Sequence, residues 1–360
     1  MATIRAAVCH QFGEAFQIED VNLAAPGDGE VEVTLAACAI CHSDITYATG
    51  AWGGALPAVY GHEAAGQISA VGSGVSGFTI GDRVLVTLIR ACGTCPTCAT
   101  ARPSICMSAP ESAPLTTMAG EPVFQAMQCG AFAERVVVHH SQLATVPEAI
   151  PLDVASLLSC GVITGVGAVI NAGKVVPGED VVIIGAGGVG LNAIQGAKLA
   201  GARRIVAVDL TAEKLDDARA FGATDGVLAT DPKPWHAMRD QIGRLADAVF
   251  VTVGATAIYD NAPRYLAPGG RLVMVGLPPS GHEAKYAPDI IASLGQSLIG
   301  TKMGDTVLTR DIPWLTDLYL QGRLELDALI SGRWSLEQIN EAITDTKAGA
   351  ARRNVIVFDH

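Results

Sequence analysis

The sequence predicts an α/β protein with two domains, one rich in β-strands and one built on a doubly wound parallel sheet. Its 360 residues are more than a single hydrophobic core commonly serves. Short alternating strand patterns separated by Gly and Pro occupy residues 1 to about 160. From about residue 170, apolar strands alternate with helical stretches. We therefore assign 1–161 and 303–360 to the β-rich domain and 162–302 to the parallel-sheet domain.

In the β-rich domain, alternation of apolar and polar residues predicts strands over 30–35 and 133–138. Residues 108–128 are enriched in Ser, Thr, Pro and Met, and we expect a loop that shapes a substrate pocket or a subunit interface. The segment after about 303 is assigned back to this domain, and its predicted elements are a helix at 312–320, a second near 336–347 and a strand at 354–358.

In the second domain, short apolar runs rich in Val and Ile predict buried parallel strands. These runs cover 181–184, 205–208, 227–229, 248–253 and 272–275, with a sixth candidate at 297–299. A helical stretch at 191–200 separates the first two, as a doubly wound sheet requires.

Charge and composition exclude some classes of partner. The chain carries 24 basic and 36 acidic residues, a net charge of −12 that disfavours nucleic acids and anionic membrane surfaces. The first residues lack a basic segment followed by an apolar one, and no run of about 20 apolar residues is present. We expect a cytoplasmic protein.

The nine cysteines are an odd number and four are clustered, which favours metal binding over disulfides.

A glycine-rich turn follows the first parallel strand. Gly185, Gly187 and Gly190 form the pattern Gly-x-Gly-x-x-Gly, with Gly188 and Val189 between the last two. The first glycine permits a tight turn, the second a close approach to a pyrophosphate, and the third close packing of helix on strand. A turn that merely saves space is the alternative. The position of this glycine pattern between a strand and a helix favours dinucleotide binding.

Asp209 ends the second strand, where a carboxylate can accept hydrogen bonds from an adenosine ribose and repel a 2′-phosphate. This favours NAD over NADP. Lys214 could contact the edge of the ribose, although a solvated lysine on a helix is an equal alternative.

Four cysteines lie within fifteen residues, at Cys92, Cys95, Cys98 and Cys106. Four thiolates at this spacing suit one closed tetrahedral zinc, which would be structural because no position is left for a substrate. Disulfides are the alternative, disfavoured in a reducing compartment.

A catalytic zinc needs three protein ligands and one open position. Candidates lie in three segments, Cys41-His42-Ser43-Asp44, Gly61-His62-Glu63 and Ser159-Cys160-Gly161. Taken singly, a Cys or His in such an apolar setting is more often part of the core.

The order of these motifs resembles that of the zinc-containing medium-chain alcohol dehydrogenases, in particular their class III-like and aryl-alcohol branches. The resemblance extends over essentially the full length, from Cys-x-Ser-Asp at 41–44 to Cys-Gly-x-x-Thr-Gly at 160–165 and the Rossmann glycines. It implies a GroES-like β-rich domain, a Rossmann domain, NAD, two zinc ions and a homodimer or homotetramer.

The same resemblance implies that Cys41, His62 and Cys160 bind the catalytic zinc. Asp44 would then orient His62, and Glu63 would lie behind the metal.

Further roles follow from the resemblance. Ser43 would accept the alcohol proton, His42 and Arg353 would contact the cofactor pyrophosphate, Thr164 the nicotinamide and Val275 its carboxamide. Arg352 is the alternative to Arg353, and a surface position is the alternative for His42. Two further positions, Trp52 and Leu88, match the family's substrate pocket, with ordinary core packing as the alternative.

One position departs from the family pattern, because Thr46 stands where many members end the proton relay with a histidine. Threonine does not titrate near pH 7, so we expect Thr46→His to gain rate mainly at low pH.

We expect an NAD-dependent zinc enzyme acting on a primary or aryl alcohol or the matching aldehyde. Three alternatives stay open. These are an S-(hydroxymethyl)glutathione (formaldehyde) dehydrogenase, a nicotinoprotein that retains its NAD, and a non-catalytic redox-linked binding protein on the same scaffold.

Overall fold

The computed structural model describes residues 1–359 and divides into two compact units. Unit 1 comprises Met1–Cys160 and the residues from Val307 onward, and unit 2 comprises Gly161–Thr306. The sequence-based boundaries, after residues 161 and 302, lie one and four residues away from these. Residues 303–306 belong to unit 2 because Gly304 packs backbone to backbone on Gly167, where an added Cβ would come within 2.4 Å of the Gly304 carbonyl oxygen.

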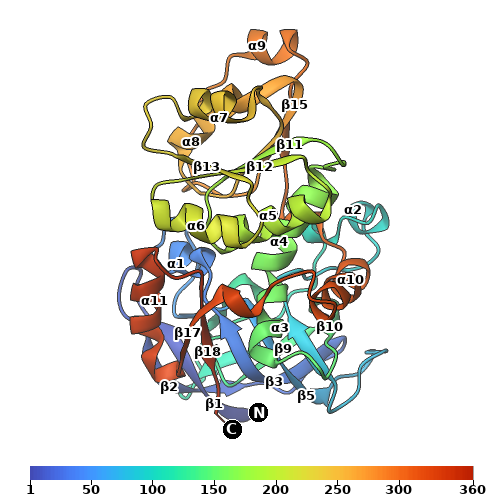
Figure 1. Cartoon of the computed structure of the whole chain (residues 1–360). Coiled ribbons are helices and arrows are strands. Elements are labelled where there is room, and N and C mark those ends of the chain that lie inside the picture. The colour runs from blue at the N-terminus through green and yellow to red at the C-terminus, as the bar shows by residue number, and fades with distance from the viewer. Residues whose placement is uncertain (360) are drawn as a thin grey trace. The chain divides into compact units, whose positions relative to one another are not determined.

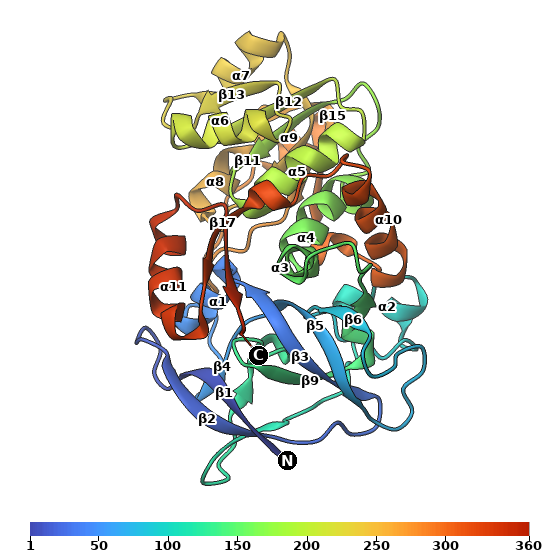
Figure 2. The same cartoon turned by 60° about the horizontal axis from the view of Figure 1, so that its bottom comes forward.

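Unit 1 contains two sheets (Figure 2). The five-stranded sheet has the order β7-β2-β1-β4-β8, and the other is β10-β6-β5-β3-β18-β17 with β9 paired to β3. Their bounds are β1 Ala2–Cys9, β2 Gln17–Leu23, β3 Glu30–Ala39, β4 Ala58–Val59, β5 Glu63–Val71, β6 Arg83–Val86, β7 Leu115–Thr117, β8 Phe124–Gln125, β9 Arg135–His139, β10 Leu143–Thr145, β17 Ile330–Trp334 and β18 Arg353–Val357.

Strand β3 organises the larger sheet because it pairs with three other strands. Its first half lies between β5 and β9, and Ala37–Ala39 lie between β5 and β18. Val31, Val33 and Leu35 are fully buried, as the alternating sequence pattern predicts. The segment 108–128, expected as a loop, supplies the short strands β7 and β8.

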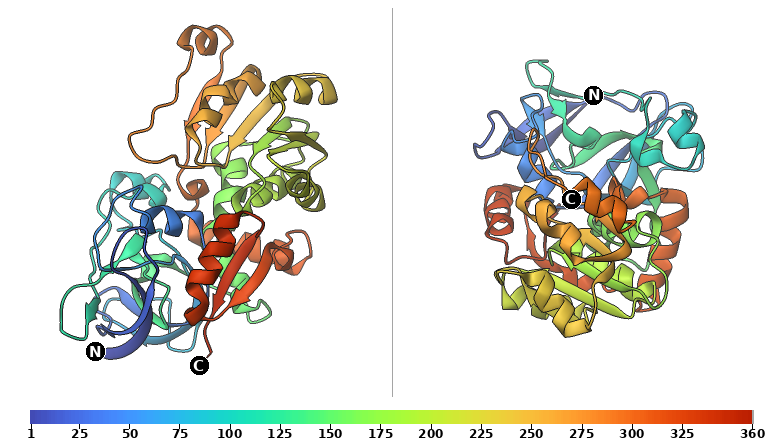
Figure 3. Two further views of the ribbon diagram at one scale, coloured as in Figure 1. Left: turned by 90° about the vertical axis from the view of Figure 1, so that its left-hand side faces the viewer. Right: turned by 90° about the horizontal axis from the view of Figure 1, so that it is seen from above.

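The α-helices of the described part of unit 1 range from four to thirteen residues. They are α1 His42–Ala48, α2 Pro96–Ala99, α3 Leu152–Ser156, α10 Leu308–Leu320 and α11 Ile339–Ala348. Figure 3 shows α11 beside β17 and β18, which its contacts with both strands support. The C-terminal helices and the closing strand were all predicted within a few residues of these bounds.

Unit 2 is a six-stranded parallel sheet of order β13-β12-β11-β14-β15-β16 with the helices α4 to α9 (Figure 1). This confirms the predicted doubly wound sheet. The bounds are α4 Gly161–Gly167, β11 Asp180–Ile184, α5 Gly188–Leu199, β12 Arg204–Asp209, α6 Ala212–Ala220, β13 Asp225–Leu228, α7 Pro234–Ile242, β14 Ala246–Val251, α8 Thr256–Asn261, β15 Leu266–Met274, α9 Pro288–Ser293 and β16 Ser297–Gly300.

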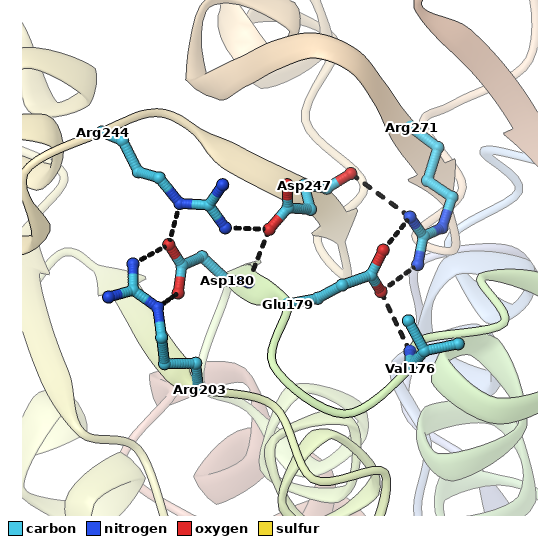
Figure 4. Close-up of polar contacts among 7 residues, drawn as sticks. All are labelled: Val176, Glu179, Asp180, Arg203, Arg244, Asp247 and Arg271. Atoms are coloured by element: carbon cyan, nitrogen blue, oxygen red, sulfur yellow. Dashed lines mark hydrogen bonds and ion pairs between the residues drawn. The ribbon is translucent and has the colours of Figure 1, made fainter.

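An ion-pair network connects four of these strands (Figure 4). The buried Asp180 carboxylate accepts hydrogen bonds from Arg203 at 2.9 and 2.5 Å and from Arg244 at 2.5 Å. Arg244 also pairs with Asp247, whose carboxylate accepts a bond from the Asp180 backbone N–H at 2.8 Å. On β15, Arg271 pairs with Glu179. The network therefore links the starts of β11, β12 and β14 to Arg271 in the second half of β15.

Among residues 1–359, no single helix is long and apolar enough to cross a membrane; a bent pair, Leu152–Ser159 with Gly161–Ala172, passes by length and composition alone.

Candidate metal centres and dinucleotide site

Strand pairing brings together the first cluster of metal-ligating groups. Cys41 lies two residues after β3, and His62 directly precedes β5. Because Ala39 pairs with Glu63 across these strands, the segments meet at one end of the sheet. Cys160 follows a short 3-10 helix, Leu157–Ser159, and one donor atom from each of Cys41, His62, Glu63 and Cys160 lies within 4.8 Å of the others.

Asp44 holds two of these segments in place. One carboxylate oxygen accepts the Gly61 N–H at 2.9 Å and lies 3.0 Å from His62 Nδ1, and the other accepts the Cys41 N–H at 2.9 Å. Asp44 is fully buried. The predicted contact of Asp44 with His62 is thus present, and its bonds to both ligand segments add to what the sequence indicated.

The donor atoms fit a metal ion. His62 Nε2 is buried and has no hydrogen-bond partner, which is costly for a polar atom unless it coordinates something. A hydrogen bond with Cys160, together with His62 and Arg353 nearby, lowers the pKa of Cys41 well below its usual value although burial raises it. A low thiol pKa favours the thiolate that binds metals.

Glu63 and Arg353 form a buried ion pair beside this cluster, with an N–O distance of 3.3 Å. Burial raises the pKa of Glu63 to about 8, although Arg353 lowers it. Neither oxygen of Glu63 has a hydrogen-bond partner. No local sequence pattern joins residues so far apart, so the pair could not be predicted; only β18 beside β3 brings Arg353 here.

The second cluster contains Cys92, Cys95, Cys98 and Cys106, whose sulfurs lie within 4.8 Å of one another. Backbone N–H groups of Cys92 and Cys95 donate to sulfurs of this set, each at 3.3 Å. The Thr97 hydroxyl and backbone N–H groups lower the pKa of Cys95 to about 5. Such an arrangement suits a closed four-thiolate metal site.

The other predicted residues of unit 1 have varied surroundings. Ser43 Oγ lies 3.7 Å from Cys41 Sγ. His42 is the exposed first residue of α1. Trp52 packs edge to face against Tyr47 with ring centroids 5.0 Å apart, and the partly buried Leu88 packs against the core.

In unit 2 the glycine-rich turn and Asp209 meet. Gly185 has φ +101°, and a Cβ on Gly190 would lie 1.7 Å from the Gly185 carbonyl oxygen, so both positions need glycine. A Cβ on Gly187 would meet nothing within 4 Å, which leaves that face of the turn open. Asp209 accepts the Ala186 N–H at 2.6 Å and the Leu210 N–H at 2.7 Å.

The remaining predicted cofactor residues of unit 2 are more dispersed. Lys214 lies half-buried in α6, and Val275 follows β15 directly. Thr164 is buried in α4, with its hydroxyl 3.7 Å from Met303 Sδ.

Comparison with known proteins agrees with these features. Residues 27–148 match the alcohol dehydrogenase GroES-like domain, and residues 188–321 match the zinc-binding dehydrogenase family. The chain is 34% identical to an NDMA-dependent alcohol dehydrogenase of Amycolatopsis methanolica, with 98% of each chain covered. This chain belongs to the zinc-dependent medium-chain alcohol dehydrogenases.

Two further members of this family are informative. An S-(hydroxymethyl)glutathione dehydrogenase of Paracoccus denitrificans is 33% identical over 98% of this chain and 99% of its own. The crystal structure of benzyl alcohol dehydrogenase from Acinetobacter calcoaceticus covers all of both chains at 29% identity, with a TM-score of 0.93. The chain is therefore an oxidoreductase of the zinc alcohol dehydrogenase type, with a GroES-like and a Rossmann domain.

Proposed function

We propose that this dehydrogenase transfers hydride between NAD and a primary or aryl alcohol or its aldehyde. A catalytic zinc would be held by Cys41, His62 and Cys160, and a structural zinc by the four-cysteine cluster. The main support is the buried donor set at the first cluster, where two thiols and the unpartnered His62 Nε2 face one another. Three protein ligands leave the open coordination position that a catalytic zinc needs. A non-catalytic binding protein would not require an open position on zinc.

The choice of NAD rests on Asp209. Its carboxylate lies at the glycine-rich turn, where it can accept bonds from a ribose and where a 2′-phosphate would meet a negative charge. Each oxygen already accepts one backbone N–H and keeps a further lone pair for a ribose hydroxyl.

The chain's own residues then have distinct tasks. Zinc, when bound, supplies a Lewis acid that polarises the alcohol or carbonyl oxygen. Ser43, close to Cys41, would accept the hydroxyl proton while passing its own proton on toward solvent, and Asp44 would keep His62 Nε2 turned toward the cluster. The Glu63 carboxyl group, paired with Arg353, lies beside the ligand atoms of this cluster.

Trp52 and Leu88, which the family resemblance assigns to the substrate pocket, favour an aryl alcohol over a charged substrate, and Trp52 packs against the ring of Tyr47. A benzyl alcohol dehydrogenase among the similar structures supports this choice. Hydroxymethylglutathione is one competing substrate, because a relative is an S-(hydroxymethyl)glutathione dehydrogenase. A retained NAD recycled by a second substrate is the other candidate, because another relative is an NDMA-dependent alcohol dehydrogenase.

The test is an assay of the purified holoprotein with NAD and benzylic, aliphatic and terpenoid alcohols or hydroxymethylglutathione, repeated with NDMA as electron acceptor. We expect the highest kcat/KM with a benzylic alcohol. NAD retained through gel filtration, with turnover only when NDMA is present, would establish the retained-cofactor alternative.

The metal and the cofactor are tested by variants. Cys41→Ser should abolish turnover and reduce the zinc content from two ions to one per chain. Cys38 is a buried cysteine outside both clusters, and Cys38→Ser should retain turnover and both zinc ions. Asp209→Ser should narrow the preference for NAD over NADP. Activity that survives complete removal of zinc by a chelator would overturn the proposed function.

A further inference from the structure

We propose that Thr87 and Ser159 are positioning residues that fix Cys160 against the segment carrying His62 and Glu63. The inference rests on the proposed metal site and assigns a role to two hydroxyl groups that the motifs leave aside.

Ser159 directly precedes Cys160 and is fully buried. Its hydroxyl donates to the Ala64 carbonyl oxygen at 2.9 Å, two residues beyond His62 on β5. Thr87, also fully buried, directly follows β6 and donates its hydroxyl to the Ser159 carbonyl oxygen at 2.5 Å. The peptide group that leads into Cys160 is therefore held from the ends of β5 and β6, which pair with each other.

The position of Thr87 is itself fixed by Gln142. Thr87 donates its backbone N–H to the Gln142 carbonyl oxygen at 3.0 Å and accepts the Gln142 side-chain amide at 2.9 Å. Gln142 is fully buried, and its amide oxygen accepts the Arg90 Nε–H at 2.6 Å. A hydrogen-bonded series thus runs from Arg90, two residues before the four-cysteine cluster, through Gln142 and Thr87 to Ser159.

Cys160 in particular needs hydrogen bonds that hold its segment to the sheet. Asp44 bonds the segments of Cys41 and His62, which adjoin sheet strands. Cys160 instead follows a 3-10 helix of three residues, Leu157–Ser159. Groups that hold ligand segments commonly change metal affinity 10- to 100-fold when removed.

Four variants separate positioning from general stability. Thr87→Val keeps the side-chain shape and removes the donor, and Ser159→Ala removes the second hydroxyl. Thr87→Ser restores a donor and serves as the rescue. Ser156→Ala is the matched control, because Ser156 is equally buried but its hydroxyl donates to Asp153 within its own helix.

The readout is the cobalt(II)-substituted full chain, with the thiolate-to-cobalt absorption of the first cluster identified by its absence in Cys41→Ser. Competition with a chelator should show affinity at this cluster reduced roughly 10- to 100-fold in Thr87→Val and Ser159→Ala, with a shifted absorption. Thr87→Ser and Ser156→Ala should bind cobalt as the unmodified chain does, and the four-cysteine cluster should be unaffected in all four.

Unchanged affinity and absorption in Thr87→Val and Ser159→Ala would overturn the inference while leaving the proposed function intact. Equal weakening in Ser156→Ala would also overturn it, because loss of any buried hydroxyl would then suffice. Failure of the unmodified chain to bind metal at the first cluster would instead reject the proposed function, and this inference with it.

Discussion

At the scale of single residues, Asp44 supports two of the ligand segments of the first metal cluster. One buried carboxylate bonds Cys41, Gly61 and His62, so it fixes two ligand segments and one ring orientation together. The family motif indicated only the last of these roles. The bonds to backbone N–H groups depend on how two strand ends meet, which no local pattern in the sequence describes.

We expect Asp44→Asn to weaken metal binding at this cluster about 10- to 100-fold, because an amide keeps the volume but loses the charge and one acceptor. Metal content after dialysis against graded chelator measures this effect. Glu30→Gln, which changes a carboxylate at the start of β3 outside both clusters, is the control. Equal metal retention in both variants would show that the Asp44 charge is dispensable.

Thr46 lies on α1 and donates its hydroxyl to the His42 carbonyl oxygen at 2.8 Å, an ordinary helical bond that carries no titratable proton. We expect Thr46→His to raise kcat/KM on the acid side of neutrality, down to the imidazole pKa of about 6.5. The pH–rate profile measures this, with Thr49→His at the C-cap of the same helix as control. A profile unchanged from that of the parent would count against a missing relay group.

At the scale of elements, the two units differ in how readily the sequence predicts them. The parallel strands of unit 2 are continuous apolar runs, since both faces are covered, and each was predicted to within a few residues apart from β15. That strand begins at Leu266 rather than 272, because a register shift near Ala246 lets the pairing start earlier. The short strands of 115–125 were missed, since two or three residues cannot establish an alternation.

The network around Asp180 predicts a pH-dependent stability. Burial raises the pKa of Asp180, but hydrogen bonds from Arg203 and Arg244 outweigh this and lower it below its usual value. Its contribution is therefore present above the unfolded pKa of about 3.9 and is lost as the pH falls through the lower folded value.

Asp180→Asn should cost about 2 kcal/mol at pH 7, less than a fully buried pair because both arginines are half exposed. The loss should shrink as the pH falls below about 4. Denaturant unfolding at several pH values measures it. Asp216→Asn, whose pair with Arg219 is exposed, should cost less than about 0.5 kcal/mol. A cost for Asp180→Asn that does not vary with pH would exclude the charge as its cause.

At the scale of the whole molecule, the chemistry is divided between the units. Both metal clusters lie in unit 1, and the glycine-rich turn with Asp209 lies in unit 2. The sequence identified each set through its order along the chain. It did not reveal Asp44 as a bridge between segments, or the Glu63–Arg353 pair, because such contacts depend on strand neighbours rather than on spacing.

Removal of the metal ions should therefore destabilise unit 1 more than unit 2. We expect a chelator to increase hydrogen exchange in unit 1, most at 41–63, 92–106 and 157–160, while β11 and β14 keep their protection. Exchange measured by mass spectrometry on the full chain checks this, and restored zinc should reverse it. Equal deprotection of the β11 and β14 peptides would show that metal supports the entire chain.

The place of β18 in the larger sheet of unit 1 has a consequence for biosynthesis. This strand lies between β3 and β17, and it carries Arg353 to the first metal cluster. On the ribosome, β3 emerges early, but its neighbour β18 is synthesised only after all of unit 2 has been translated. Until then, the end of β3 lacks the pairing with β18, and Glu63 lacks its ion-pair partner Arg353. We therefore expect stable metal binding at the first cluster only after translation is complete.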